Sequence, residues 1–267
     1  MDTVVDPVVD PVETPAPRLV VEAARVPSLI PPIWHDTVRQ LGMKERKEAG
    51  LSLAHAFATD PLSVYLLADE LDKGWPPERL WKLHVRIMRY TFAAYRLRGV
   101  ATAVGPDYEA IALWTPPGKF NDDWWATLWS GTWRLWYQLP SEARRRFFTE
   151  LVPALHDARK QVMGDLNNDC WYLGYIGTKP NARGRGYASK LIGAMAEQAD
   201  AENRPIYLES SSLANIKLYE KFGFEVKNEI ALKRGPTPVY LYCMVRTPQP
   251  SVLQQSVTES STEGLKA

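Results

Sequence analysis

A glycine-rich run between a predicted strand and a predicted helix constrains this chain more than any other feature. The run reads Arg183-Gly-Arg-Gly-Tyr-Ala188. Residues 171–178 before it are aromatic and β-branched, and they stop at a turn containing Pro180, which is typical of a buried strand. Apolar residues after the run recur at helical spacing through Ala199. The run therefore lies where a strand leads into the N-terminus of a helix.

This position favours the binding of a phosphate or pyrophosphate. Free backbone N–H groups and the positive end of the helix dipole point at a ligand that docks there. Gly184 and Gly186 have no Cβ, so the backbone can take unusual φ values and a phosphate can approach it closely. Arg183 and Arg185 add positive charge. The alternative is a surface turn with solvated arginines, because short motifs also match by chance.

Two other nucleotide-binding motifs fit poorly. A Walker loop requires G-x-x-x-x-G-K-[ST], and the sequence contains no such string. A dinucleotide fingerprint requires G-x-G-x-x-G or A, whereas Gly184, Gly186 and Ala188 place the third small residue wrongly.

The run instead resembles the acetyl-CoA site of the GNAT (GCN5-related N-acetyltransferase) superfamily. Its signature Q/R-x-x-G-x-G/A is matched by Arg183, Gly186 and Ala188. The resemblance continues through a second strand at residues 205–210 and through a closing helix and turn at residues 215–224. It implies an α/β fold with a mixed sheet, the GNAT acyltransferase fold, here with inserted helices.

The resemblance also implies where acetyl-CoA would bind. The strand that ends at Thr178 would splay from the strand that carries Glu209, and the pantetheine arm would lie in the gap. An N–H near Ile176 would stabilise the oxyanion that develops on the acetyl carbonyl. The residues that the resemblance assigns to the cofactor are Ile176, Gly177, Thr178, Arg183, Gly184, Arg185, Gly186, Tyr187, Ala188, Ser189, Asn215 and Tyr219.

Two residues are candidates for catalysis. Tyr219 matches the position of the family's usual general acid, which would protonate the departing thiolate. Its alternative role is an amphipathic ring packed under the helix. Glu209 would face the gap and could take the ammonium proton directly or through water. Its alternatives are to bind or orient the amine, or to lie at a solvated strand end.

We expect an acetyl-CoA-dependent N-acetyltransferase that acts on the primary amine of a small molecule by direct attack, with both reactants held together. Two alternatives stay open. One is a protein or peptide N-acetyltransferase, and the other is a CoA-binding regulatory protein with the same fold, because fold does not fix function. The sequence does not indicate whether the chain is a monomer or a homodimer.

Composition bounds the partners and the compartment. The chain has 267 residues, 45% of them hydrophobic, and 32 basic against 31 acidic residues give a net charge of +1, which suggests neither nucleic acid nor a membrane surface as partner. Cys170 and Cys243 have no metal-ligand spacing and are typical of thiols in a reducing compartment, so we expect a cytoplasmic protein without a metal site.

The domain prediction is a single GNAT domain at residues 28–247 with two disordered tails. Residues 1–27 are acidic and Pro-rich, and residues 248–267 are rich in Gln, Ser and Thr. The cofactor half spans about 170–226 and a helical insertion spans about 121–165. Helical periodicity predicts helices at residues 50–68 and 77–98, and Gly105 marks a hairpin between strands at residues 100–104 and 108–114.

Three features near or within the insertion could bear on the substrate. Tryptophans at positions 125, 129, 133 and 136 share one helix face, and we expect this stripe to pack on the core; a wall of the substrate site is the alternative. Residues 144–146 are three arginines, interpreted as a solvated face or else as a contact for the CoA 3′-phosphate or an acidic substrate. Asp60 could attract an ammonium, although Asp before Pro is also a turn signal.

Overall fold

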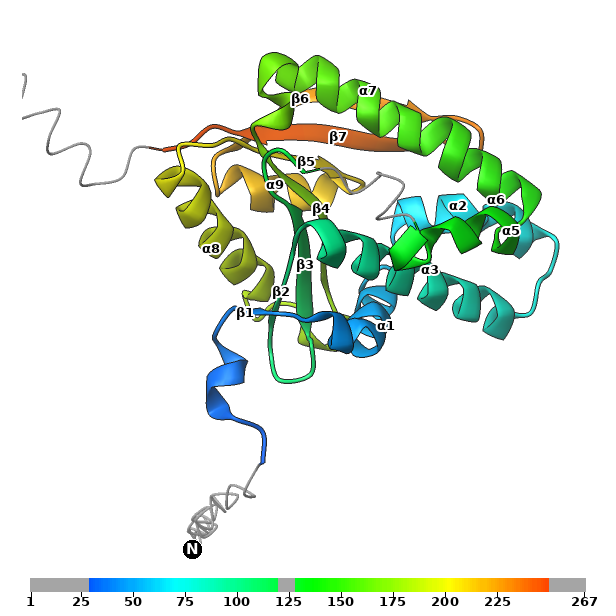
Figure 1. The fold of residues 1–267 in the computed structure, drawn as a ribbon. Helices are drawn as coiled ribbons and strands as arrows, with labels where there is room; N and C mark the ends of the chain where they lie inside the picture. Colours follow the sequence, from blue (N-terminus) through cyan, green and yellow to red (C-terminus); the bar gives the residue numbers. More distant parts are fainter. Residues whose placement is uncertain (1–28, 120–127, 250–267) are drawn as a thin grey trace, which may run out of the picture. The chain divides into compact units, whose positions relative to one another are not determined.

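The structure is a computed structural model that describes residues 29–119 and 128–249. A mixed sheet lies at its centre, with the strand order β1-β2-β3-β4-β5-β7-β6 (Figure 1). The strands are β1 (Arg39–Gln40), β2 (Val100–Val104), β3 (Ala110–Thr115), β4 (Trp171–Thr178), β5 (Ile206–Ser210), β6 (Phe224–Leu232) and β7 (Val239–Arg246). Neighbouring strands are antiparallel except β4 and β5, which are parallel. The predicted α/β fold with a mixed sheet is confirmed.

The helices cover both faces of this sheet. They are α1 (Arg46–Ala56), α2 (Pro61–Asp72), α3 (Pro77–Arg98), α5 (Leu135–Gln138), α6 (Ser141–Arg145), α7 (Val152–Met163), α8 (Tyr187–Ala201) and α9 (Leu213–Glu220). On one face, α1 and α3 contact β3, and α2 and α7 contact β7. On the other face, α8 contacts β2, β3 and β4, and α9 contacts β5 and β6. Figure 1 shows α7 running along β6 and β7.

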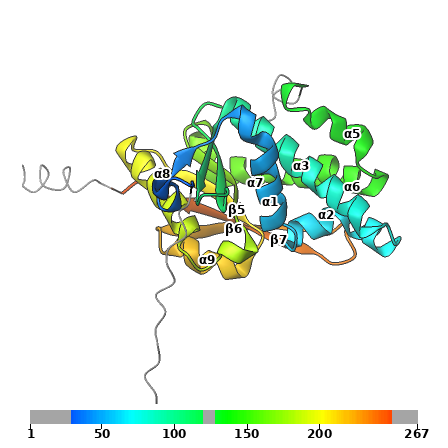
Figure 2. The same ribbon diagram turned by 90° about the horizontal axis from the view of Figure 1, so that it is seen from below.

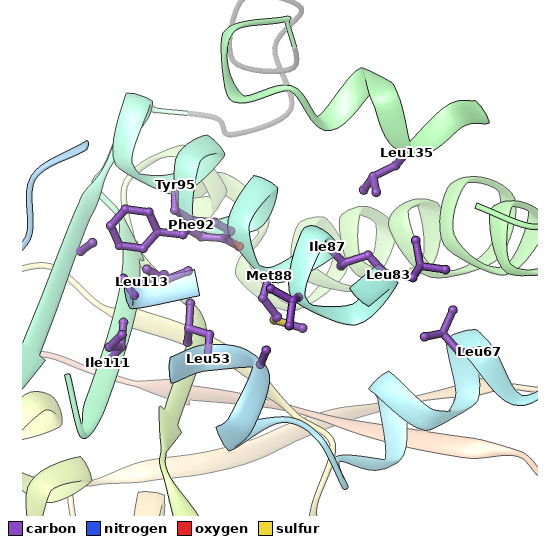
Figure 3. Close-up of a cluster of buried hydrophobic side chains, with 14 of the residues drawn as sticks. Leu53, Leu67, Leu83, Ile87, Met88, Phe92, Tyr95, Ile111, Leu113 and Leu135 are labelled. Carbon is purple, nitrogen blue, oxygen red and sulfur yellow. The ribbon is translucent and has the colours of Figure 1, made fainter. Parts of the chain in front are cut away.

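Side chains of β3 and β5 alternate between these faces, as the pleat of a strand requires. Ile111 and Leu113 pack with Phe92 of α3 (Figure 3), whereas Ala112 and Trp114 pack with α8. In β5, Ile206 and Leu208 belong to the α8 side, so Tyr207 and Glu209 point to the face that α2 and α7 cover.

The predicted helix at residues 50–68 is wrong, because the chain forms two helices there. α1 ends at Ala56, and α2 begins at Pro61, where a proline needs no hydrogen-bond acceptor for its nitrogen. The Asp60 carboxylate caps α2 by accepting a hydrogen bond from the Ser63 N–H at 3.0 Å. Helical periodicity runs through this cap and hides it. The helix predicted at residues 77–98 is confirmed as α3, and β2 and β3 confirm the hairpin.

The insertion between β3 and β4 is built from several short helices. The 3₁₀ turn η3 (Thr132–Arg134) precedes α5, and the π-helical segment η4 (Arg146–Leu151) joins α6 to α7. Figure 2 shows α5 and α6 beside α2 and α3, and contacts between α2 and α6 and between α3 and η3 agree with that view. The insertion therefore adds to the helical layer on the α2 and α3 side.

The predicted packing of the tryptophan stripe on the core is wrong for its described members. Gly131 has a φ of 85°, which interrupts the helix between Trp129 and Trp133. The side chains of Trp129, Trp133 and Trp136 are 70%, 42% and 60% exposed. Trp125 lies outside the described residues.

The interpretation of the three arginines as a solvated face is also wrong in part. Arg146 is 2% exposed, and its guanidinium donates to the Tyr65 carbonyl at 2.8 Å and pairs with the Asp69 carboxylate. Arg144 donates to the Trp136 carbonyl, and Arg145 pairs with Glu142 at 3.7 Å. A helix places consecutive residues on different faces, so one of the three turns inward, where a carbonyl and a carboxylate satisfy it.

Candidate active site

A cleft opens where β4 and β5 separate. The two strands pair only over the first three residues of β4, Trp171 to Leu173. Beyond them lies a cleft of about 560 Å³, hereafter the splay cleft, whose walls are the end of β4, the glycine-rich loop, the start of α8, and α9. The predicted separation of these strands is confirmed. Because no strand pairs with Ile176 and Thr178 on the β5 side among the described residues, an extended ligand can pair with that edge of β4.

The glycine-rich loop has the backbone conformation that its sequence predicts. Gly184 and Gly186 have φ values of 79° and 75°, in the left-handed region that favours glycine. Gly186 is the N-cap of α8, and Lys190 donates to its carbonyl at 3.0 Å. The N–H groups of Tyr187, Ala188 and Ser189 precede this first helical bond, and these residues line the splay cleft with the loop. The loop thus presents a helix N-terminus to the cleft.

Eleven of the twelve residues predicted to contact the cofactor line the splay cleft. They are Ile176, Gly177, Thr178, Arg183, Gly184, Gly186, Tyr187, Ala188, Ser189, Asn215 and Tyr219.

The two arginines of the loop have different positions. Arg183 lines the cleft while its guanidinium donates to the Ala56 carbonyl at 3.2 Å, so it ties the loop to the end of α1. Arg185 is absent from the described lining of the cleft, because its guanidinium turns to the Glu109 carboxylate at 3.4 Å and to the Asn181 carbonyl.

Tyr219 is a buried residue of α9 that reaches the splay cleft. It is 5% exposed, and its ring packs against Phe224 with centroids 5.9 Å apart. Burial raises the pKa of the Tyr219 phenol above its usual value, and the charge of Asp60 adds to this shift. The phenol therefore stays protonated at neutral pH and can act as a hydrogen-bond or proton donor.

A second cavity, hereafter the helical cavity, adjoins the splay cleft. Its volume is about 490 Å³, and its walls come from α2, α3, η4, α7 and the middle of β4, with single residues of β5 and β7. Phe57 and Asp60 line both spaces, so the cleft and the cavity meet at these two residues. The inserted helices contribute the wall formed by Phe147, Phe148, Leu151, Val152 and Leu155.

Glu209 lies in the wall of the helical cavity. Burial raises the pKa of its carboxyl group to about 7, although the hydroxyl groups of Tyr172 and Tyr207 and the charge of Arg159 oppose the shift. Its Oε1 atom is buried without a hydrogen-bond partner among the described residues. A carboxyl group with this pKa changes its charge near neutral pH, as a general base for an ammonium requires.

A β-bulge in β4 shapes the cavity wall next to Glu209. The register with β3 shifts so that Leu113 faces Tyr175 and Trp114 faces Leu173, which leaves Gly174 as the extra residue. Tyr172 and Tyr175 therefore both line the helical cavity although they are three residues apart. A Cβ at Gly174 would lie 1.8 Å from the Tyr95 hydroxyl oxygen, so the Tyr95 ring fills the space that glycine leaves.

Asp60 combines a structural role with a place at the junction. Its carboxylate caps α2 and accepts a hydrogen bond from the Ser211 hydroxyl just past the end of β5. The turn interpretation is therefore confirmed. The same side chain lines both the cleft and the cavity, and it places a second carboxylate near Glu209 in the walls of the cavity.

Sequence reasoning missed most of the cavity wall. Phe57, Thr91, Tyr95, Phe147 and Phe148 come from the end of α1, α3 and η4, and each has the spacing of an ordinary apolar helix face. Only the length of the insertion pointed to this region. The described tryptophans of the stripe and the three arginines line neither space.

The two cysteines are buried and lie outside both spaces. Burial raises the pKa of the Cys170 thiol and raises that of Cys243 to about 11. The described part of the chain holds no group of three or more His, Cys, Asp or Glu residues that could bind a metal ion. Within residues 29–119 and 128–249, no helix is long and apolar enough to cross a membrane.

Comparison with known proteins gives consistent similarities. A sequence model of the acetyltransferase (GNAT) family matches residues 133–224. The chain is 38% identical over 211 residues to a Schizosaccharomyces pombe protein described as an uncharacterized N-acetyltransferase, and the match covers 79% of this chain and 83% of the relative.

Two solved structures have a similar fold. A mosquito arylalkylamine N-acetyltransferase like 5b is 12% identical, with a TM-score of 0.55 and coverage of 79% of this chain and 99% of that one. A Corynebacterium glutamicum protein, titled histone acetyltransferase HPA2 and related acetyltransferase, is 21% identical, with a TM-score of 0.50 and coverage of 81% and 98%. At these identities the two structures support the fold alone.

Proposed function

The chain belongs to the GNAT acetyltransferase family and is an N-acetyltransferase, and on this premise we propose that it transfers an acetyl group from acetyl-CoA to the primary amine of a small molecule. The observation that carries the proposal is the junction of two spaces. The splay cleft has a helix N-terminus and glycines suited to a pyrophosphate, and the helical cavity has two carboxylates suited to an ammonium. Phe57 and Asp60 mark where the two reactants would meet.

The splay cleft offers groups for each part of acetyl-CoA. The N–H groups at the start of α8 and the positive φ of Gly184 and Gly186 suit the pyrophosphate. The free edge of β4 at Ile176 and Thr178 suits the amide groups of the pantetheine arm. An N–H of this edge would stabilise the oxyanion that develops on the acetyl carbonyl. Asn215 lines the same cleft from α9.

The chemistry needs two proton transfers, and two residues are placed for them. Glu209 accepts a proton from the ammonium, directly or through water, so that the amine nitrogen can bond to the acetyl carbon. The carbon–sulfur bond then breaks, and Tyr219 donates a proton to the departing thiolate. Asp60 attracts the ammonium at the junction while Ser211 and Ser63 hold its carboxylate.

Direct attack fits the described residues better than transfer through a cysteine. Cys170 and Cys243 line neither space, and burial raises the pKa of both thiols, so neither favours the thiolate that a nucleophile needs. Holding both reactants at the junction meets the entropic cost of their encounter on binding.

Initial-rate kinetics test this proposal. Thiol release is measured while acetyl-CoA and 2-phenylethylamine are varied together, and a ternary complex predicts intersecting double-reciprocal lines. Parallel lines would indicate a covalent acetyl-enzyme and contradict direct attack. A peptide panel with free lysine and free α-amine serves as the comparison, and faster acetylation of a peptide than of every small amine would overturn the small-molecule assignment.

A further inference from the structure

The charges of the helical cavity are all of one sign and lie in few places. Its ionisable side chains besides tyrosine are Asp60 and Glu209, and its described lining contains no Lys, Arg or His. Asp60 marks the junction with the splay cleft. The remaining walls are mostly aliphatic and aromatic, with Leu62 and Leu66 from α2 and Ile87 and Met88 from α3. Figure 3 shows Ile87 and Met88 on α3 with Leu135 on the neighbouring α5.

From this distribution we propose that the enzyme selects monoamines with a bulky apolar body and rejects diamines, polyamines and amino acids. The inference rests on the proposed function and names its substrate class. One ammonium is satisfied by Asp60 and Glu209. The rest of the molecule lies against apolar walls in a cavity of about 490 Å³, which is a common size for sites that enclose small molecules.

A second charge has no partner in these walls. A diamine would place its other ammonium among side chains such as Leu66, Ile87 and Phe147, where no described carboxylate can pair with it. It can bind only after that ammonium loses its proton. An amino acid would bring a carboxylate next to Asp60 and Glu209, and the described lining holds no cation to balance it.

The apolar walls should reward apolar substrate surface. Phe57, Tyr95, Tyr172 and Tyr175 form part of the wall, and the rings of Phe57 and Tyr95 each pack edge-on against Tyr175, with centroids 5.6 and 5.8 Å apart. Each buried methylene is worth about a fourfold gain in affinity, so a series from propylamine to hexylamine should gain about fiftyfold in kcat/KM. Aromatic edges and faces also suit an aryl group.

The first test compares substrates that differ by one charge. Thiol release gives kcat/KM for n-hexylamine and 1,6-diaminohexane, and for 2-phenylethylamine and L-phenylalanine. Only about one terminal ammonium in 250 is neutral at about pH 8, so hexylamine should be preferred by about 100-fold. The preference should fall by about tenfold at about pH 9, because the neutral fraction rises tenfold. Phenylethylamine should exceed phenylalanine by a similar factor.

Several outcomes would overturn the inference. A diamine acetylated within about threefold of hexylamine, or a preference that does not change with pH, would show that a second charge is tolerated. Those outcomes leave acetyl transfer to small amines intact. If no small amine is acetylated while calorimetry still shows acetyl-CoA binding, the proposed function itself fails, and the inference fails with it.

A pair of variants tests the location of the discrimination. Val152 lines the helical cavity and is 36% exposed, so a polar side chain there keeps contact with water. Val152→Glu supplies a carboxylate for the second ammonium and should raise kcat/KM for diaminohexane relative to hexylamine by at least about tenfold. Val152→Gln has the same shape without the charge and should leave the ratio unchanged. Equal ratios in the two folded variants would contradict the assignment of this cavity to the amine.

Discussion

Replacing Glu209 by Gln should lower the rate while making the protein more stable, a combination that loss of folding cannot produce. Burial raises the pKa of this carboxyl group from 4.5 to about 7. The unfolded chain therefore releases this proton at lower pH than the folded chain, and stability from this group falls as pH rises from 4.5 to about 7. Above that range the ionised form costs the fold at most about 3 kcal/mol, and Gln removes the cost.

The magnitudes follow from the same shift. At about pH 6 only a tenth of Glu209 is ionised, so kcat/KM should be about tenfold below its plateau, with an acid limb near the pKa of about 7. Glu209→Gln should lower the plateau by about 10² to 10⁴ and remove this limb, leaving a rate that follows the ionisation of the amine. At about pH 8 the Tm of the variant should rise by about 3 to 10 °C.

The assay is thiol release from acetyl-CoA with 2-phenylethylamine across the pH range, with thermal unfolding of the same samples. Glu225→Gln is the matched control, because Glu225 is an exposed glutamate of β6 that is absent from the lining of the cavity. It should change neither profile. A Glu209→Gln variant that keeps the limb near pH 7, or that loses both activity and stability, would refute the reasoning.

Two further predictions concern other elements. Tyr219→Phe should lower kcat by about 10² while leaving the Kd of acetyl-CoA nearly unchanged, and turnover equal to the wild type would return Tyr219 to a packing role under α9. Arg146→Met should lower the free energy of unfolding in urea by about 3 kcal/mol, because it leaves the Tyr65 carbonyl and the Asp69 carboxylate without their partner; a loss below about 1 kcal/mol would contradict the importance of this buried ion pair.

The sequence predicts local structure best where one short segment determines it. The glycine-rich loop is such a case, because positive φ at Gly184 and Gly186 and the start of α8 follow from a few adjacent residues. Helix α3 is another, since Pro77 starts an amphipathic pattern that ends at Arg98. The Asp60 cap shows the limit, because a continuous apolar periodicity conceals a break that two residues make.

The helical cavity could not be predicted in the same way. Its wall joins α2, α3, η4, α7 and β4, which are far apart in the sequence. Whether Phe148 faces a cavity or a neighbouring helix depends on how these elements pack, and both positions have the same helical spacing. The exposure of Trp129 and the burial of Arg146 fail for a related reason, because polar and aromatic side chains take their environment from neighbouring segments.

Binding of acetyl-CoA to the splay cleft is the central claim, and calorimetric titration of two glycine variants tests it most directly. Gly186 and Gly74 both have positive φ, 75° and 69°, and a Cβ at either position would meet no described atom beyond its chain neighbours within 4 Å, but only Gly186 lines the cleft. Both Val variants therefore carry similar backbone strain. Gly186→Val should weaken acetyl-CoA binding by at least about tenfold, whereas Gly74→Val should bind as the wild type does. Equal affinity in all three proteins would contradict the assignment of the cleft to acetyl-CoA.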